Sequence, residues 1–207
     1  MAIAVIWLLT IRPAHSQSTP RRPSQVPVDL PTTCTNSVVR KEIRSTTDQE
    51  WAMIAGVVRR MRRDGWFDWY AYMHDQLFDQ VHENSIFFPF HRRFVRDFEV
   101  AGQRYNPAFF VPYWDAAADY QQPSNSVVLS SKYLGGNGQG SDSCLMDGVD
   151  GNVIIHYPET RCLQRSFSGQ DGQILPWYST DYIQGVIDRA TTMEYLRNYI
   201  ENSIHGA

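Results

Sequence analysis

The chain has 207 residues, of which 43% are hydrophobic and 13% aromatic, and its formal net charge is -3 at pH 7. This length suits one domain with a sizeable core, and a disordered chain would carry fewer apolar and aromatic residues. The small negative charge gives no electrostatic reason to expect nucleic acid as a partner. After the N-terminus no segment is long and apolar enough to span a bilayer, so the sequence predicts no membrane partner.

The N-terminus carries an apolar run over residues 3–11 that is too short to span a membrane. The sequence AHS at 14–16 has the small-x-small form of a signal-peptidase site. We therefore expect residues 1–16 to be a signal peptide and the protein to be secreted; a buried N-terminal strand or helix is the alternative. Residues 17–33 are rich in Pro and Ser and are expected to form an extended leader before a domain over 34–207.

The first predicted helix begins at a capping box, Thr47-Asp48-Gln49-Glu50. Apolar residues follow at helical spacing up to Gly65, which is expected to end the helix: Trp51, Ile54, Val58 and Met61. A second helix is predicted over about 66–78, with His74 at the edge of its apolar stripe.

A third helix is predicted to start near Pro89, a residue suited to the first helical position. Its spacing places His91 on the inward face, with Phe94 and Phe98. Residues 121–177 read as a long loop with little regular structure. Helical signals return near residue 179 and at a second predicted capping box, from which an apolar stripe runs to the C-terminal histidine: Thr191-Thr192-Met193-Glu194, then Tyr195, Leu196, Tyr199, Ile200, Ile204 and His205. The expected fold is mainly α.

Three of the six histidines lie within eighteen residues of one aromatic stretch: His74, His82 and His91. Neutral imidazoles are common ligands of copper, zinc and iron, and an unpaired polar group is costly in apolar surroundings. On one straight helix the Cα atoms of His74 and His82 would be about 12 Å apart, near the limit for sharing an ion. The helix should therefore end before His82. The alternative is three core histidines bonded to backbone or carboxylate groups.

The chain has three cysteines. Cys144 and Cys162 flank a loop rich in Gly and Asp, and in a secreted protein they are expected to form a disulfide. Cys34 is then left without a partner.

Taken together, these residues resemble the tyrosinase family of type-3 copper proteins. FFPFHRRFVRDFE around His91 is similar to the family's F-L-P-W-H-R block, and NPAFFVPYWDAAAD follows it. VRKEIRSTTDQEW, GGNG and the CLQR that begins at Cys162 also match. The resemblance extends from about Cys34 to the C-terminus.

The resemblance implies an antiparallel, four-helix-bundle-like copper domain with long loops. Two copper ions, each held by three histidines, would bind O2 between them, hydroxylate monophenols and oxidise o-diphenols to o-quinones. It assigns His74, His82 and His91 to the first copper. It also implies that His205 is the first ligand of the second copper, four residues after the Glu201 that matches a family glutamate. An alternative register makes Glu201 the first ligand and His205 the second.

The chain departs from the family pattern at the second copper. It ends two residues before the next ligand of that site would fall, so the resemblance implies a C-terminally incomplete domain, inactive in this form. Gln80 stands where some members carry a cysteine that is crosslinked to the second histidine, and Gly206 stands where members have a water-positioning Asn. Two other functions fit the same residues: a non-catalytic copper and O2 binder like the haemocyanins, or an inert fragment. His156 is expected to lie in a loop.

Overall fold

The computed structural model describes residues 19–20, 23 and 37–205. In this part of the chain the fold is mainly helical, as the sequence predicts, with five α-helices and one two-stranded sheet. The predicted signal peptide (1–16) lies outside the described residues, as does the 17–33 leader apart from three residues. Cys34 and Gly206 lie outside them too. Within the described ranges, no helix combines the length and apolar character needed to cross a membrane.

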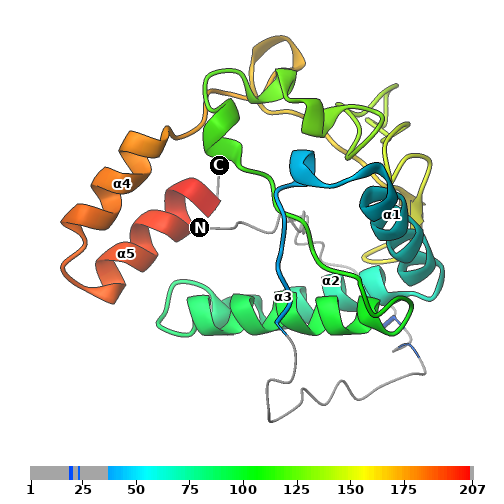
Figure 1. Ribbon diagram of the computed structural model, residues 1–207, viewed down its shortest axis with the longest axis horizontal. Coiled ribbons are helices and arrows are strands. Elements are labelled where there is room, and N and C mark those ends of the chain that lie inside the picture. Colours follow the sequence, from blue (N-terminus) through cyan, green and yellow to red (C-terminus); the bar gives the residue numbers. More distant parts are fainter. Residues whose placement is uncertain (1–18, 21–22, 24–36, 206–207) are drawn as a thin grey trace.

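Three long helices form the core: α1 (Asp48–Arg63), α2 (Trp66–Val81) and α3 (Phe87–Gln103) (Figure 1). The capping box at the start of α1 is confirmed, because the Thr47 hydroxyl accepts from the Glu50 N–H and the Glu50 carboxylate accepts from the Thr47 N–H. Gly65 joins α1 to α2 with a φ of 82°, a left-handed conformation that favours glycine.

The core is built largely from aromatic side chains of these helices and of the segment after α3. Tyr70 of α2 makes edge contacts with Phe94 and Phe98 of α3, at ring-centroid distances of 5.3 Å each. The predicted inward residue Val58 is only partly buried, whereas its neighbour Val57 is 4% exposed. Other core residues come from α1, α2 and the segment after α3: Trp51, Ile54, Met61, Trp66, Phe109, Phe110, Val111 and Trp114.

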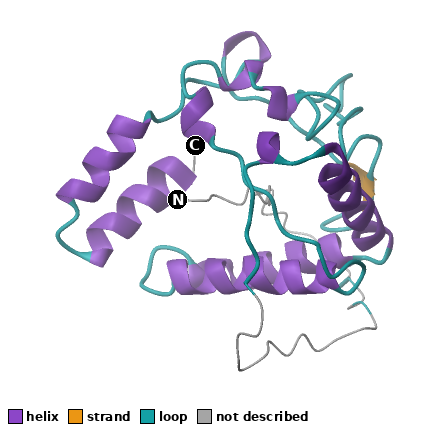
Figure 2. Cartoon of the chain, in the orientation of Figure 1, coloured by secondary structure: helices purple, strands orange, loops and turns teal. Residues whose placement is uncertain are grey.

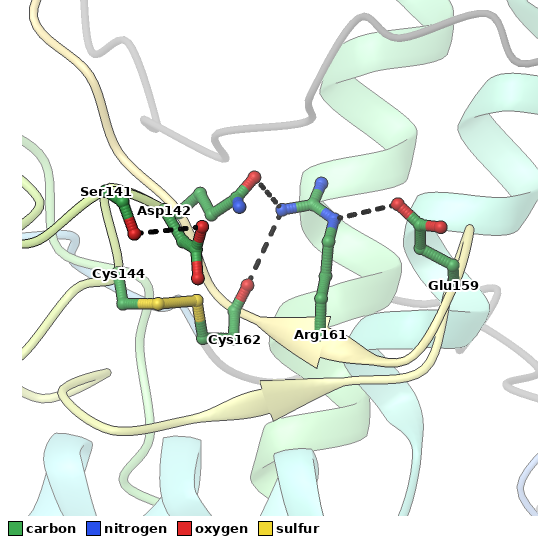
Figure 3. Close-up of a disulfide and its surroundings, with 7 residues drawn as sticks. Ser141, Asp142, Cys144, Glu159, Arg161 and Cys162 are labelled. Atoms are coloured by element: carbon green, nitrogen blue, oxygen red, sulfur yellow. Dashed lines mark hydrogen bonds and ion pairs between the residues drawn. A yellow bond between two sulfur atoms is a disulfide. The ribbon is translucent and has the colours of Figure 1, made fainter.

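The long loop predicted over 121–177 contains only short regular elements, as Figure 2 shows. Three single turns of 3-10 helix lie within it: Pro123–Asn125, Val127–Leu129 and Gln170–Gly172. Two more lie outside it, at Ile43–Ser45 and Ala116–Asp119. Its two strands, β1 (Ile154–Ile155) and β2 (Arg161–Cys162), pair antiparallel. The predicted disulfide joins Cys144 to Cys162, with Cα atoms 5.6 Å apart. Figure 3 shows it beside Arg161, which pairs with Glu159.

The C-terminal part contains α4 (Thr180–Arg189), α5 (Met193–Tyr199) and a π-helical turn, Ile200–His205. Figure 1 shows α4 and α5 side by side as a hairpin, with α5 near the α2–α3 loop. The predicted capping box at 191–194 is wrong. The cap is Thr192, whose hydroxyl accepts from the Tyr195 N–H, and a tyrosine at that third helical position has no carboxylate to return the bond.

Candidate metal centre

The three clustered histidines come from two helices and the start of the loop between them. His74 lies on α2 and His91 on α3, while His82 follows the last residue of α2 in an extended conformation, with φ -107° and ψ 160°. The helix therefore ends before His82, as the spacing predicts. One ring nitrogen from each histidine lies within 4.8 Å of the other two.

Backbone carbonyl groups orient two of these rings. His82 Nδ1 lies 2.9 Å from the carbonyl oxygen of Phe78, and His91 Nδ1 lies 2.8 Å from that of Phe87. A carbonyl oxygen can only accept, so each Nδ1 carries the proton and donates it. In the neutral rings the lone pair is then on Nε2, which is the atom free to bind a metal.

The spacing of the nitrogens fits a single ion. His74 Nε2 and His91 Nε2 are 3.2 Å apart. Two imidazole nitrogens at this separation, each about 2.0 Å from one ion, would subtend about 105° at it, close to a tetrahedral angle. The described residues therefore fit a metal ion without rearrangement of this pair.

Aromatic rings enclose the triad. Phe78 stacks on His82 with ring centroids 4.2 Å apart, and Phe87 packs against His91 at 4.5 Å. Phe94 lies 5.8 Å from His74. His74 and His82 are each 9% exposed, whereas His91 is half-buried. His91 is therefore the most exposed member of the triad.

This apolar enclosure favours the uncharged imidazoles that metal binding requires. Burial, reinforced by the neighbouring His82 and His91 rings, lowers the pKa of His74 to about 4. Burial also lowers the pKa of His91. Both rings are consequently neutral at pH 7, with nitrogen lone pairs available.

His205 reaches the edge of the triad but does not join it. Its ring centroid lies 5.7 Å from that of His91, 6.2 Å from that of His82 and 5.2 Å from that of Phe87. Its side chain is more exposed than those of the triad, and its nitrogens are not among those that converge on one point. Its predicted role as the first ligand of a second ion stays a prediction.

The expected apolar stripe before His205 packs inward only in part. Ile200 and Ile204 are 5% and 3% exposed, but Tyr199 is 38% exposed. A π-helical turn shifts the register of the helix by one residue, so the spacing of an ordinary α-helix does not continue through Ile200–His205.

Glu201 is buried beside the triad and both its carboxylate oxygens are engaged. Oε1 accepts from the Glu83 N–H at 2.7 Å, and Oε2 lies 2.5 Å from the guanidinium of Arg197, itself only 7% exposed. Glu201 is not among the converging ligand atoms. Sequence reasoning missed Arg197, although its position four residues before Glu201 is a usual spacing for a helical ion pair.

Two further carboxylates, for which the sequence predicts no role, connect the helices that carry the triad to other segments. Glu99 of α3 is 1% exposed and binds Arg40, Arg96 and the Val111 N–H, which ties α3 to the segments on both sides of it. Asp75, next to His74, accepts from the Tyr157 hydroxyl at 2.6 Å.

His156 confirms its predicted place in the loop. It is exposed, and its Nδ1 lies 3.2 Å from the Thr160 hydroxyl. Its backbone N–H donates to Asp68 of α2, so this loop is anchored to the helix that carries His74.

These features define a helical domain with a three-histidine cluster that could hold a metal ion. A family model described as the common central domain of tyrosinase matches residues 63–201, which include the triad. The chain belongs to this family.

Relatives match it across much of its length. Grixazone synthase from Streptomyces griseus subsp. griseus is 29% identical over 157 residues, covering 66% of this chain and 51% of its own. A tyrosinase from Streptomyces antibioticus is 30% identical over 118 residues, 53% of this chain and 42% of its own. Tyrosinase ustQ from Aspergillus flavus is 29% identical over 200 residues, 83% of this chain and 56% of its own. The chain thus spans about half the length of these curated relatives.

Proposed function

We propose that this protein is a copper oxidoreductase that uses O2 to oxidise phenols and o-diphenols to o-quinones, with its first copper on His74, His82 and His91. The observation that carries the proposal is the convergence of three ring nitrogens within 4.8 Å of one another. Copper held there would supply a centre that cycles between Cu(I) and Cu(II).

The donor set supports copper over the hard cations. Three imidazoles suit copper, zinc and iron, whereas magnesium and calcium take oxygen ligands. Zinc fits the same three nitrogens, and membership of the tyrosinase family is the reason to choose copper.

The protein supplies position and surroundings to this centre. Backbone carbonyls fix the His82 and His91 tautomers, and the rings of Phe78 and Phe87 exclude water around them. A phenol would approach from the more exposed side, between His91 and His205.

We further propose that His205 binds a second copper. Oxidation of phenols by a two-copper centre requires more ligands than this one residue, so we expect catalysis in a form of the protein that supplies them. For the 207-residue chain we expect about one tightly bound copper and little catechol oxidation, because three ring nitrogens converge in its described part.

Secretion is part of the proposal. The apolar run and AHS sequence at the N-terminus favour a signal peptide. The Cys144–Cys162 disulfide fits an oxidising compartment, since cytosolic proteins rarely keep structural disulfides.

Copper titration of the purified chain tests the function. We expect about one copper per chain, lost in His82→Ala and kept in His156→Ala, whose histidine lies in an exposed loop. A form extended beyond His205 with further histidines should bind a second copper and turn over catechol. Two bound coppers without quinone formation in that form would favour the non-catalytic O2-binding function instead. Equal copper loss in both alanine variants would overturn the triad assignment.

A further inference from the structure

A single buried carboxylate connects the C-terminal helical segment to the histidine loop. Glu201 is 6% exposed and lies 118 residues from Glu83, whose N–H donates to Glu201 Oε1 at 2.7 Å. This contact falls one residue after His82. It is a direct bond between the π-helical turn that carries His205 and the loop that carries a triad histidine.

The bond completes the restraint of one peptide group. The peptide between His82 and Glu83 is planar, so holding both its oxygen and its N–H fixes its orientation. The His82 carbonyl accepts from the Asn84 side-chain amide at 2.7 Å, and the Glu83 N–H is held by Glu201. The orientation of this peptide sets how the His82 Cα, and with it the imidazole, faces the triad.

The backbone at Glu83 requires such a restraint. Its φ is 56°, in the left-handed region that residues other than glycine rarely adopt. Such conformations are costly and persist where surrounding contacts impose them. The contact from Glu201 is of this kind, because it is made by a buried side chain and is charge-assisted.

Arg197 holds the other side of the same carboxylate. Its guanidinium lies 2.5 Å from Glu201 Oε2 and also bonds the Asn198 side chain. A buried carboxylate needs partners of this kind to remain charged. The pair Arg197–Glu201 therefore aims Oε1 at the histidine loop.

We propose that Glu201 is a positioning residue for His82. Through the bond from the Glu83 N–H to Glu201, metal binding at the triad would order the segment that bears His205. The inference rests on the proposed copper site. It gives Glu201 a role through the Glu83 amide rather than as a metal ligand. Because coupling free energies are reciprocal, ordering that segment also strengthens metal binding at the triad.

Two double variants separate the hydrogen bond from the ion pair. Arg197→Met/Glu201→Gln keeps a side-chain oxygen that can accept from the Glu83 N–H, whereas Arg197→Met/Glu201→Met has none. Neither leaves a buried charge unpaired, and the side chains at 201 are both unbranched. The two double variants therefore differ chiefly in whether residue 201 has an oxygen that can accept from the Glu83 N–H.

Copper affinity and amide exchange are the two readouts. We expect the Met/Met variant to bind copper about tenfold more weakly than the Met/Gln variant, the loss typical of an outer-shell contact to a metal ligand. Copper should slow amide exchange over residues 193–205 in the unmodified chain and in Met/Gln, but not in Met/Met. A role in folding alone would not produce this metal-dependent difference.

Equal copper affinities and equal exchange in the two variants would overturn the inference. If the His82→Ala variant bound copper as tightly as the unmodified chain, the proposed function would instead be overturned. If the Met/Met variant does not fold, the unmodified chain decides the matter by NMR with Cu(I). The Glu83 amide should be protected and should exchange more slowly when the metal is bound, together with residues 193–205. Rapid exchange at Glu83 in both states would contradict the proposal.

Discussion

At the scale of single residues, the centre depends on bonds made by atoms that do not face it. His82 and His91 each donate Nδ1–H to a carbonyl four residues earlier, at Phe78 and Phe87. The same arrangement thus recurs at the end of α2 and at the start of α3. It leaves Nε2 of both rings directed inward, where His74 completes the set.

Burial of His74 makes the stability of the metal-free protein depend on pH. The folded-state pKa is about 4, below the ordinary value of 6.5. As the pH falls below 6.5 the unfolded chain takes up the proton first, so the stabilisation present above 6.5 is lost progressively down to about pH 4. Denaturant unfolding at pH 7 and pH 4.5 should show a loss larger by about 2 kcal/mol in the wild type than in His74→Phe. Equal losses would contradict the burial of this ring.

At the scale of elements, the sequence predicts the start of a helix where side-chain and backbone bonds within a few residues cap that helix. The reciprocal bonds of Thr47 and Glu50 are encoded within four residues, and α1 begins there. The sequence predicts the start of α3 near Pro89, whereas the helix begins two residues earlier, at Phe87. Pro is tolerated at the third helical position because the first four N–H groups of a helix have no intrahelical partner. The sequence predicts the end of α2 near Phe78, whereas the helix continues to Val81. It ends there because the backbone of His82 is extended.

Replacing a glycine by alanine should have opposite effects on stability at two helical positions, Gly102 and Gly56. A Cβ on Gly102 of α3 would lie 2.3 Å from the Phe109 ring, whereas a Cβ on Gly56 of α1 would meet nothing within 4 Å. Gly102→Ala should destabilise the fold by about 1–3 kcal/mol through overpacking. Gly56→Ala should stabilise it by up to about 1 kcal/mol through helix propensity. Thermal unfolding measures both, and a neutral Gly102→Ala would show that α3 does not pack this closely on Phe109.

At the scale of the whole molecule, the sequence predicts what is local and misses what is distant. The triad lies within one helical hairpin, so its spacing was enough to predict convergence. The bond from Glu201 to Glu83 and the ties from Glu99 to Arg40 and Val111 depend on how remote segments pack. No periodicity encodes those contacts. The π-helical turn likewise changed the register before His205 in a way that α-helical spacing does not foresee.

The loop that the disulfide closes bonds to α2 through the His156 N–H and the Tyr157 hydroxyl, which donate to Asp68 and Asp75, but it supplies none of the converging ring nitrogens. Cys144 and Cys162, 18 residues apart, close a loop outside the α2–α3 hairpin. Reduction should cost about 3 kcal/mol of stability by releasing that loop in the unfolded state. Copper affinity, measured below the unfolding temperature of the reduced protein, should change less than threefold. A large fall in affinity on reduction would show that the loop supports the triad directly.

The central claim is that His74, His82 and His91 bind one copper together through Nε2. X-ray absorption and pulsed EPR of the copper-loaded chain test it most directly, because they give ligand distances and the number of coordinated imidazoles. We predict three imidazole nitrogens at about 2.0 Å, falling to two in His91→Ala. Fewer than three imidazoles in the unmodified chain, or a copper spectrum unchanged by His91→Ala, would contradict the account.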